Sequence, residues 1–309
     1  MGAGIGAPVS RLEVRQGWEL RVAHARSSPG HRVAGSQHPA TRMRSIGMPT
    51  MPEVAALHHT HWIVVPCYDE TKWIAGVVDA IAAQDQRDFA LVIVNNASTD
   101  DTRAKAEAQI AQHPHLTGIV IDEPEKGTGC AADTGFRYAI AHGAKIICRT
   151  DADCLPTPTW FGRLVRALET RDLDCVAGRL KVRTDDVELS PVELFVSRFG
   201  MVSVRLLGPW IKSNQGDDYL RRYIMLPGPN VGMTAAAYEA CGGYTRKSFE
   251  VAFLDKEIAN AMRRHTKRIA YVRSAVVMFS ERRTKAYGVR GTVAWIRSRG
   301  GVKVSVDVR

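Results

Sequence analysis

The sequence predicts an α/β protein built on a doubly wound, mostly parallel sheet that is flanked by helices. Two observations predict this class. Short apolar strand patterns alternate with longer helical patterns from residue 61 onward, and a polar cluster follows each of the first four strand patterns. Alternation of this kind is typical of parallel sheets with right-handed crossovers. Because ligands of such sheets bind beyond the carboxyl ends of the strands, functional residues are expected in those clusters.

The expected elements follow from the spacing of apolar residues along the chain. Residues 63–65 are the first strand pattern, and Thr71 is placed to cap a helix whose apolar residues recur at helical spacing up to Ile81. Further strands are expected at 89–94, 116–121, 145–148 and 175–182. Further helices are expected from about 98 to 112, and at 129–142, 160–168 and 194–211.

The net charge of +10 comes from the two ends of the chain. Residues 1–50 contain seven Arg and two Glu, and residues 281–309 contain eight basic and two acidic residues, so the remainder carries −1. A basic nucleic-acid surface would have to lie in the ends, and we expect no nucleic-acid partner. Residues 1–56, rich in Gly, Ser, Pro, Arg and His, are expected to be a disordered basic leader, and residues 283–309 a basic tail.

Several features indicate a cytoplasmic protein. No apolar run reaches the roughly 18–20 residues of a membrane span. Arg11, Arg15 and Arg21 interrupt every apolar run near the N-terminus that could serve as a secretory signal. The six cysteines are dispersed without a C-x-x-C motif, which is typical of buried thiols in a reducing compartment.

The most informative polar cluster is Asp151-Ala152-Asp153, which follows the apolar strand expected at 145–148. Two carboxylates at this spacing repel each other unless a cation or solvent neutralises them. Hard oxygen ligands suit Mg²⁺ or Mn²⁺, which keep coordination positions for substrate phosphates. Such an ion offsets the charge that develops on a diphosphate leaving group. The pair therefore predicts a divalent-metal site at this edge of the sheet.

Further polar motifs follow the other strands and recur later in the chain. They are Pro66…Tyr68…Glu70, Asn95-Asn96-Ala97-Ser98-Thr99-Asp100-Asp101-Thr102, Lys126-Gly127…Asp133-Thr134-Gly135, Gly228-Pro229-Asn230…Gly242-Gly243-Tyr244 and Phe253-Leu254-Asp255-Lys256-Glu257. In this order and spacing, the motifs resemble the family 2 glycosyltransferases, which have the GT-A nucleotide-sugar fold. The resemblance covers about residues 61–282. It implies a domain over 57–282, with a donor half at about 57–155 and an acceptor-side subregion at about 156–282.

The resemblance also implies a role for each matching residue. Asp151 and Asp153 would bind Mg²⁺ or Mn²⁺, and Asp255 would take the proton from the acceptor hydroxyl in an inverting transfer. The nucleotide-sugar would be bound by Pro66, Tyr68, Glu70, Asn95, Asn96, Lys126, Gly127 and Asp151.

The chain departs from the family pattern at several of these positions. Asn95 and Asn96 stand where the family usually has Asp; an Asn carbonyl can accept from a uracil N3–H, but the amide also donates. Ala132 stands where the family often has Arg, and Leu254 where it usually has Glu. Relatives often supply a late His to the metal, and Glu281 is the candidate in its place.

The helix expected at 194–211 has two interpretations. Its apolar residues recur at three- and four-residue steps, and Arg198 and Arg205 share one face. It is either a packed helix with two solvated arginines, or an acceptor-side helix that contacts anionic lipid head groups at a membrane surface. In the second case the basic tail, including Arg282, would add to the attraction, and the protein would sit at the inner face of the membrane.

The expected function is transfer of a sugar from a nucleoside-diphosphate sugar to a carbohydrate or lipid-linked acceptor. A non-catalytic nucleotide-sugar binder remains an alternative, as does a sugar-phosphate nucleotidyltransferase, although residues 66–70 lack the glycine-rich basic loop of those enzymes. A dinucleotide-binding oxidoreductase is a third. Its fingerprint requires a turn directly after the strand, whereas residues 122–126 separate the third strand from Gly127-x-Gly129-x-x-Ala132.

Overall fold

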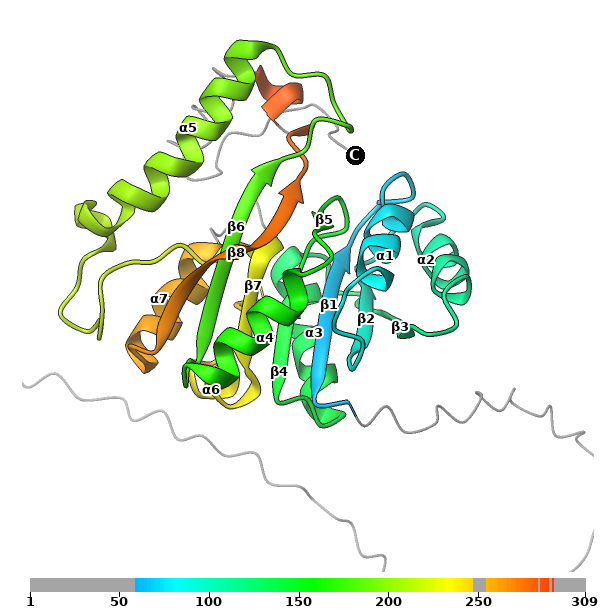
Figure 1. The fold of residues 1–309 in the computed structure, drawn as a ribbon, viewed down its shortest axis with the longest axis horizontal. Helices are drawn as coiled ribbons and strands as arrows, with labels where there is room; N and C mark the ends of the chain where they lie inside the picture. Colours follow the sequence, from blue (N-terminus) through cyan, green and yellow to red (C-terminus); the bar gives the residue numbers. More distant parts are fainter. Residues whose placement is uncertain (1–58, 247–253, 283, 289–290, 292–309) are drawn as a thin grey trace, which may run out of the picture. The chain divides into compact units, whose positions relative to one another are not determined.

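The computed structural model describes residues 59–246, 254–282, 284–288 and 291 (Figure 1). The expected leader at 1–56 and most of the expected tail at 283–309 lie outside the described residues. Among the residues that are described, no helix combines the length and the apolar character needed to cross a bilayer.

The sheet of the described chain has eight strands in the order β3-β2-β1-β4-β7-β6-β8-β5. These are β1 (His61–Cys67), β2 (Ala90–Asn95), β3 (Thr117–Asp122), β4 (Ile146–Arg149), β5 (Leu155–Pro156), β6 (Cys175–Val182), β7 (Val231–Thr234) and β8 (Ile269–Phe279). β1 is parallel to β2 and β4, β2 to β3, and β6 to β8. β7 runs antiparallel between β4 and β6, and β5 antiparallel to β8. The predicted doubly wound, mostly parallel sheet is confirmed.

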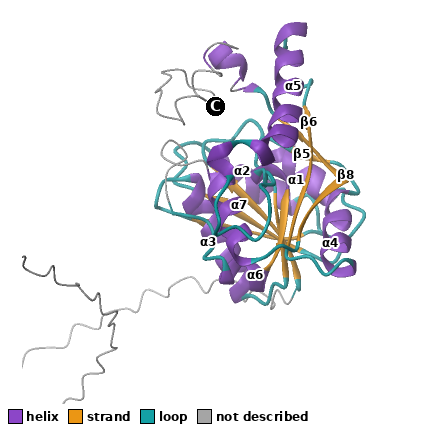
Figure 2. Cartoon of the chain, turned by 90° about the vertical axis from the view of Figure 1, so that its left-hand side faces the viewer, coloured by secondary structure: helices purple, strands orange, loops and turns teal. Residues whose placement is uncertain are grey.

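Helices cover both faces of this sheet (Figures 1 and 2). The helices are α1 (Ile74–Ala82), α2 (Thr102–Ala111), α3 (Thr128–Ala141), α4 (Trp160–Thr170), α5 (Pro191–Leu207), α6 (Ala235–Ala240) and α7 (Leu254–His265). One buried cluster contains residues of α1, α2 and α4 together with Ile63 and Val65 of β1. A second contains residues of α3, α6 and α7 together with Trp62 and Val64. Successive β1 side chains therefore enter opposite cores, which explains why the strand is apolar throughout.

The order of the strands determines where a ligand can bind. From β1 the chain proceeds outward to β2 and β3, and then returns to β4 on the other side of β1. The strand order thus reverses between β1 and β4. Doubly wound sheets bind their ligands beyond the carboxyl ends of the strands at such a point, which we call the β1–β4 edge. The loops that follow these two strands carry residues 68–70 and 151–153, which the topology brings to one place.

Two sequence-based details are corrected by the structure. Thr71 does not cap α1: the helix begins at Ile74 after Trp73, which makes no side-chain cap, and the Thr71 N–H instead donates to Asp100 Oδ2 at 3.2 Å. The helix expected at 194–211 ends at Leu207, and residues 208–210 form a separate 3₁₀ turn. Pro209 lacks the N–H that a continued α-helix would use.

A glycine sets the distance between α3 and the sheet. A Cβ on Gly135 would lie 2.5 Å from Val64 Cγ1 and 2.9 Å from Val94 Cγ2, both inside van der Waals contact. We expect Gly135→Ala to lower the free energy of unfolding by about 1–3 kcal/mol through overpacking. Gly200→Ala, in exposed α5 with nothing within 4 Å, should leave it unchanged or raise it by up to about 1 kcal/mol. Urea denaturation measures both, and equal midpoints would contradict this account of the packing.

Candidate active site

The loops after β1 and β2 are joined to each other at the carboxyl edge of the sheet. The Glu70 N–H donates to Thr102 Oγ1 at 2.7 Å, and the Asp69 carboxylate accepts from the Thr99 N–H at 2.7 Å. Asp69 and Ala97 both have positive φ angles, 51° and 54°. Such backbone strain is uncommon outside glycine and persists where the surrounding contacts impose it, often at functional sites.

Asn95 is the last residue of β2. Of the two polar atoms of its side chain, Nδ2 is hydrogen-bonded and Oδ1 has no partner in the described structure. Its Nδ2 donates to Asp122 Oδ1 at 2.9 Å, and this bond, together with Arg103, holds the pKa of Asp122 below its usual range. An ionised carboxylate only accepts, so the amide orientation is fixed. The Asn95 Oδ1 atom is buried and has no hydrogen-bond partner in the described structure. Since a buried acceptor without a partner is costly, this oxygen is suited to an N–H of a ligand.

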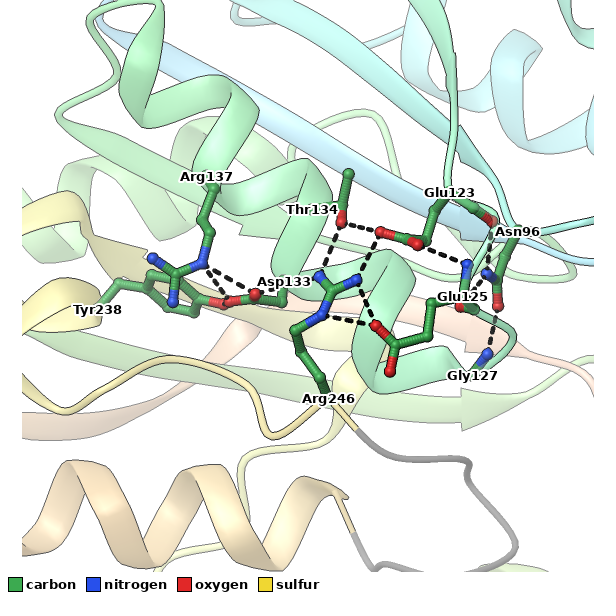
Figure 3. Close-up of polar contacts among 9 residues, drawn as sticks. All are labelled: Asn96, Glu123, Glu125, Gly127, Asp133, Thr134, Arg137, Tyr238 and Arg246. Carbon is green, nitrogen blue, oxygen red and sulfur yellow. Dashed lines mark hydrogen bonds and ion pairs between the residues drawn. The ribbon is translucent and has the colours of Figure 1, made fainter. Parts of the chain in front are cut away.

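Asn96 organises the loop after β3. Its Nδ2 donates to the Glu123 and Glu125 carbonyls at 2.9 and 2.8 Å, and its Oδ1 accepts from the Gly127 N–H at 2.8 Å (Figure 3). Both amide hydrogens are therefore used by the protein backbone. We infer that Asn96 and Gly127 shape the loop, rather than provide donors for a nucleotide.

The other residues expected to bind the nucleotide take different positions. Lys126 is exposed; its Nζ donates to the Tyr68 hydroxyl and lies 3.9 Å from the centre of that ring. Pro66 is buried within β1, paired with Val94. Tyr68 and Lys126, from loops 58 residues apart, are thus brought together, whereas Pro66 lies in the sheet.

A network around Arg246 was not predicted. Its guanidinium bonds Glu123 Oε2 at 2.8 Å and Glu125 Oε2 at 2.9 Å, and it also contacts Thr134 and Asp133 of α3 (Figure 3). Asp133 is held in turn by Arg137 and by the Tyr238 hydroxyl. The arginine expected on α3 is missing from the sequence, but Arg246 brings a guanidinium to that helix from a distant loop. Because three carboxylates surround it, we infer that it anchors its own loop to α3 and to the loop after β3.

Each of the two central aspartates is paired with an arginine. Asp151 Oδ1 accepts from Arg149 Nε at 3.1 Å and Nη2 at 2.9 Å, and Asp153 Oδ2 lies 3.2 Å from Arg282 Nε. Arg282 Nη2 also bonds Glu70, which connects the loop after β1 to the loop after β4. Burial raises the pKa of Glu70 to about 7, opposed by Arg282 and reinforced by the nearby charges of Asp153 and Asp151.

Asp255 reaches this cluster from α7. It lies in the first turn of α7, half-buried, and its Oδ1 accepts from the Gly228 N–H at 3.0 Å. Burial raises its pKa to about 6, while Arg149 lowers it and Asp151 raises it. Arg149 is buried so closely against Gly228 that a Cβ there would lie 2.9 Å from the guanidinium. Arg149 therefore lies between Asp151 and Asp255.

Sequence reasoning missed both arginines of this cluster. Arg149 ends the buried run Ile146-Ile147-Cys148, and a charged residue there was a detectable signal. Arg282 was expected to add, with the basic tail, to the attraction toward lipid head groups; this is wrong, since its side chain is only 15% exposed and joins two acids. Glu281, considered as a metal ligand, instead accepts a hydrogen bond from Ser197 of α5.

The acids of the cluster fit a hard divalent cation. Four acids, Glu70, Asp151, Asp153 and Asp255, lie here with two arginines, Arg149 and Arg282. Among the described residues, no group of three or more Asp, Glu, His or Cys side chains is placed so that it could hold a metal ion by itself. Mg²⁺ and similar ions are usually held by one or two carboxylates together with substrate phosphates, so a complete cage is not required.

A doubly wound sheet with acidic loops gathered at its strand-order reversal is the architecture of the GT-A nucleotide-sugar transferases. The family model described as "Glycosyl transferase family 2" matches residues 62–227. The chain belongs to this family. The oxidoreductase and nucleotidyltransferase alternatives are therefore wrong.

Curated relatives match part of the chain. An undecaprenyl-phosphate mannosyltransferase of Micrococcus luteus is 27% identical over 114 residues, 36% of this chain and 44% of the relative. A dodecaprenyl-phosphate galacturonate synthase of Rhizobium johnstonii is 25% identical over 140 residues, 44% of this chain and 40% of the relative. The matched segments thus span less than half of each relative.

Two solved structures share the fold. S. aureus TarS in complex with UDP-GlcNAc aligns with a TM-score of 0.52 and 13% identity, over 72% of this chain and 58% of that one. The mannosyltransferase PcManGT of Pyrobaculum calidifontis, in complex with GDP-Man and Mn²⁺, aligns with a TM-score of 0.51 and 21% identity, over 80% of this chain and 66% of that one. At these identities the likeness establishes the GT-A fold.

Proposed function

We propose that this glycosyltransferase is an inverting, divalent-metal-dependent enzyme that moves a sugar from a nucleoside-diphosphate sugar to an acceptor hydroxyl. The observation that carries the proposal is the gathering of Glu70, Asp151 and Asp153 with Asp255 around two arginines at the β1–β4 edge. We assign the donor to residues of about 57–155 and the acceptor to residues of about 156–282.

The nucleoside side of the proposal rests on Asn95. Its buried Oδ1 has no partner among the described residues and can accept a hydrogen bond, while its amide nitrogen donates to Asp122. Uracil, thymine and guanine carry a ring N–H that can donate to such an oxygen, whereas adenine and cytosine could donate only through an exocyclic amino group. Tyr68 and Lys126 flank the same edge and would contact the nucleotide. We therefore expect a uridine, thymidine or guanosine diphosphate donor, the classes to which the ligands of TarS and PcManGT also belong.

The proposed metal dependence follows from the charges that would meet at the diphosphate. A nucleoside diphosphate is an anion, and the excess of carboxylates at this edge would repel it without a cation. Asp151 and Asp153 would hold Mg²⁺ or Mn²⁺, which when bound neutralises charge on the leaving diphosphate. The Mn²⁺ in the PcManGT complex agrees with this assignment. Arg149 and Arg282 would keep the two aspartates in place.

On the acceptor side, Asp255 is proposed as the general base. It would take the acceptor proton as the oxygen attacks the anomeric carbon from the face opposite the diphosphate, which inverts the configuration. A pKa of about 6 keeps the carboxylate mostly ionised at neutral pH, yet more basic than an ordinary Asp. The names of the curated relatives contain polyprenyl phosphates, which favours a lipid-linked acceptor for this chain at the cytoplasmic face of a membrane.

Thermal unfolding in the presence of donors tests the donor class. A ligand that binds only the folded state adds RT ln(1 + [L]/Kd) to the free energy of unfolding, about 2.7 kcal/mol at a ligand concentration of 100 times Kd. The melting temperature rises accordingly. We expect one of UDP-, GDP- or dTDP-sugars to raise it when Mn²⁺ is present and to lose the effect with EDTA. ADP- and CMP-sugars are the matched controls. A shift with the controls alone, or one unaffected by EDTA, would contradict the proposal.

A further inference from the structure

Helix α5 displays an apolar surface that none of the described residues covers. Five residues on one face, which we name the α5 stripe, have exposed fractions between 47% and 66%. They are Val192, Phe195, Phe199, Val202 and Leu206. The helix stands apart from those that cover the sheet (Figures 1 and 2). A contiguous exposed apolar surface of this kind marks an interaction site.

The stripe points away from the rest of the domain. Ser197 hydrogen-bonds to Glu281 and so marks the side of α5 that faces the domain. At 3.6 residues per turn, Phe195 lies about 200° from Ser197 around the helix. The Arg205 guanidinium turns back over the Tyr271 ring, 5.2 Å from its centre. The contacts that hold the helix in place thus leave the stripe facing outward.

The apolar surface continues past the end of the helix. Leu207, Trp210 and Ile211 are all exposed, Trp210 by 68%. Trp210 lies under the Arg222 guanidinium at 4.5 Å, and Lys212 is exposed beside it. Tryptophan flanked by basic residues is enriched at the boundary between lipid head groups and acyl chains.

The flanking charges decide between two partners for this surface. Arg198 and Arg205 lie on one side of the stripe, and Val196 and Ser203 on the other, so neither side carries an acid. A second copy packed antiparallel along the stripe would offer Arg198 no carboxylate from either flank of its own stripe. Anionic head groups are complementary to Arg198 and Lys212, which are both exposed.

We propose that the α5 stripe and the 207–211 turn are the surface by which this chain binds an anionic bilayer. The inference deepens the proposed function and rests on it for the lipid-linked acceptor. Glu281, which holds α5, directly precedes Arg282 of the acidic cluster. A bilayer in contact with α5 would therefore present a lipid-linked acceptor next to the acceptor half of the site.

Vesicle flotation of the full chain tests the surface. We expect wild type to float with phosphatidylcholine vesicles that contain phosphatidylglycerol. Phe195→Asp with Phe199→Asp should lower the bound fraction by more than about tenfold, because two charges enter the apolar face. Ala104→Asp with Ala108→Asp, which adds the same charge at the same spacing to the exposed face of α2, should bind like wild type. Arg198→Gln with Lys212→Gln should lower the preference for anionic over neutral vesicles about tenfold or more.

Three outcomes would overturn the inference. If wild type stays in solution, or if the phenylalanine double variant floats as well as the α2 control, the α5 stripe does not bind a bilayer. A dimer seen by light scattering that the phenylalanine variant dissociates, without vesicle binding, assigns the stripe to a second copy. Donor hydrolysis in solution should be equal in wild type and the phenylalanine variant. A chain that floats but does not hydrolyse any donor would contradict only the proposed function.

Discussion

Asp153→Asn is expected to lower turnover by at least about 100-fold, the loss that follows removal of one electrostatic stabiliser of a transition state. The substitution keeps the shape of the side chain and a hydrogen-bond acceptor for Arg282, but removes the negative charge that we assign to the cation. Release of nucleoside diphosphate from the preferred donor with Mn²⁺ or Mg²⁺ measures the effect. The variant should also lose the metal-dependent part of the donor thermal shift.

The matched control for this variant is Asp172→Asn. Asp172 is 86% exposed, pairs with Arg268 away from the site, and has a φ of 47°, which Asn tolerates. It should turn over like wild type. If Asp153→Asn retained full turnover with an unchanged metal requirement, Asp153 would not be a metal ligand.

Asp255→Asn is expected to lower the rate of transfer to a hydroxyl acceptor by about 10²–10⁴-fold, the usual contribution of a general base. Asn can still accept the bond from the Gly228 N–H, so α7 should remain in place. Glu257→Gln, about 200° away around the same helix, is the control and should remain active. Product formation with the identified donor and acceptor provides the measurement.

The pH profile gives an independent test of Asp255. A general base must be ionised to act, and burial raises the pKa of this carboxyl to about 6. The wild-type rate should therefore fall as the pH drops through about 6. The residual rate of Asp255→Asn should not show this decrease at acidic pH. If both rate and profile were unchanged in the variant, no base would be needed. That result would indicate a phosphate acceptor, which is itself largely ionised at neutral pH.

The donor half of the fold could be predicted from the sequence because its signals are local. The alternation of strand and helix patterns predicts β1 to β4 without any knowledge of long-range contacts. It also predicts that Asp151 and Asp153 follow the end of a strand. β7 was not predicted, since Val231–Thr234 is only four residues long and its antiparallel pairing depends on β4 and β6, far away in the chain. The prediction that Thr71 caps a helix was wrong for the same reason. The Thr71 N–H donates to Asp100 in the loop after β2, a contact between distant segments of the chain.

The arginines of the site could not be assigned for a comparable reason. Arg246 and Glu123 are 123 positions apart, and Arg282 and Glu70 are 212 apart. Nothing in the local sequence distinguishes an arginine drawn into a buried acidic cluster from one that remains in solvent. Arg149 is different, because an apolar strand with a terminal charge is itself a signal. The roles of the acids could be inferred from motifs, whereas their charge partners required the fold.

The most direct test of the central claim is a crystal structure of the chain with Mg²⁺ and its preferred nucleotide-sugar. The account predicts the ion between the diphosphate and the carboxylates of Asp151 and Asp153, with Mg–O distances of about 2.0–2.1 Å. A diphosphate bound elsewhere, or bound at the β1–β4 edge without an ion or either carboxylate in contact, would contradict it.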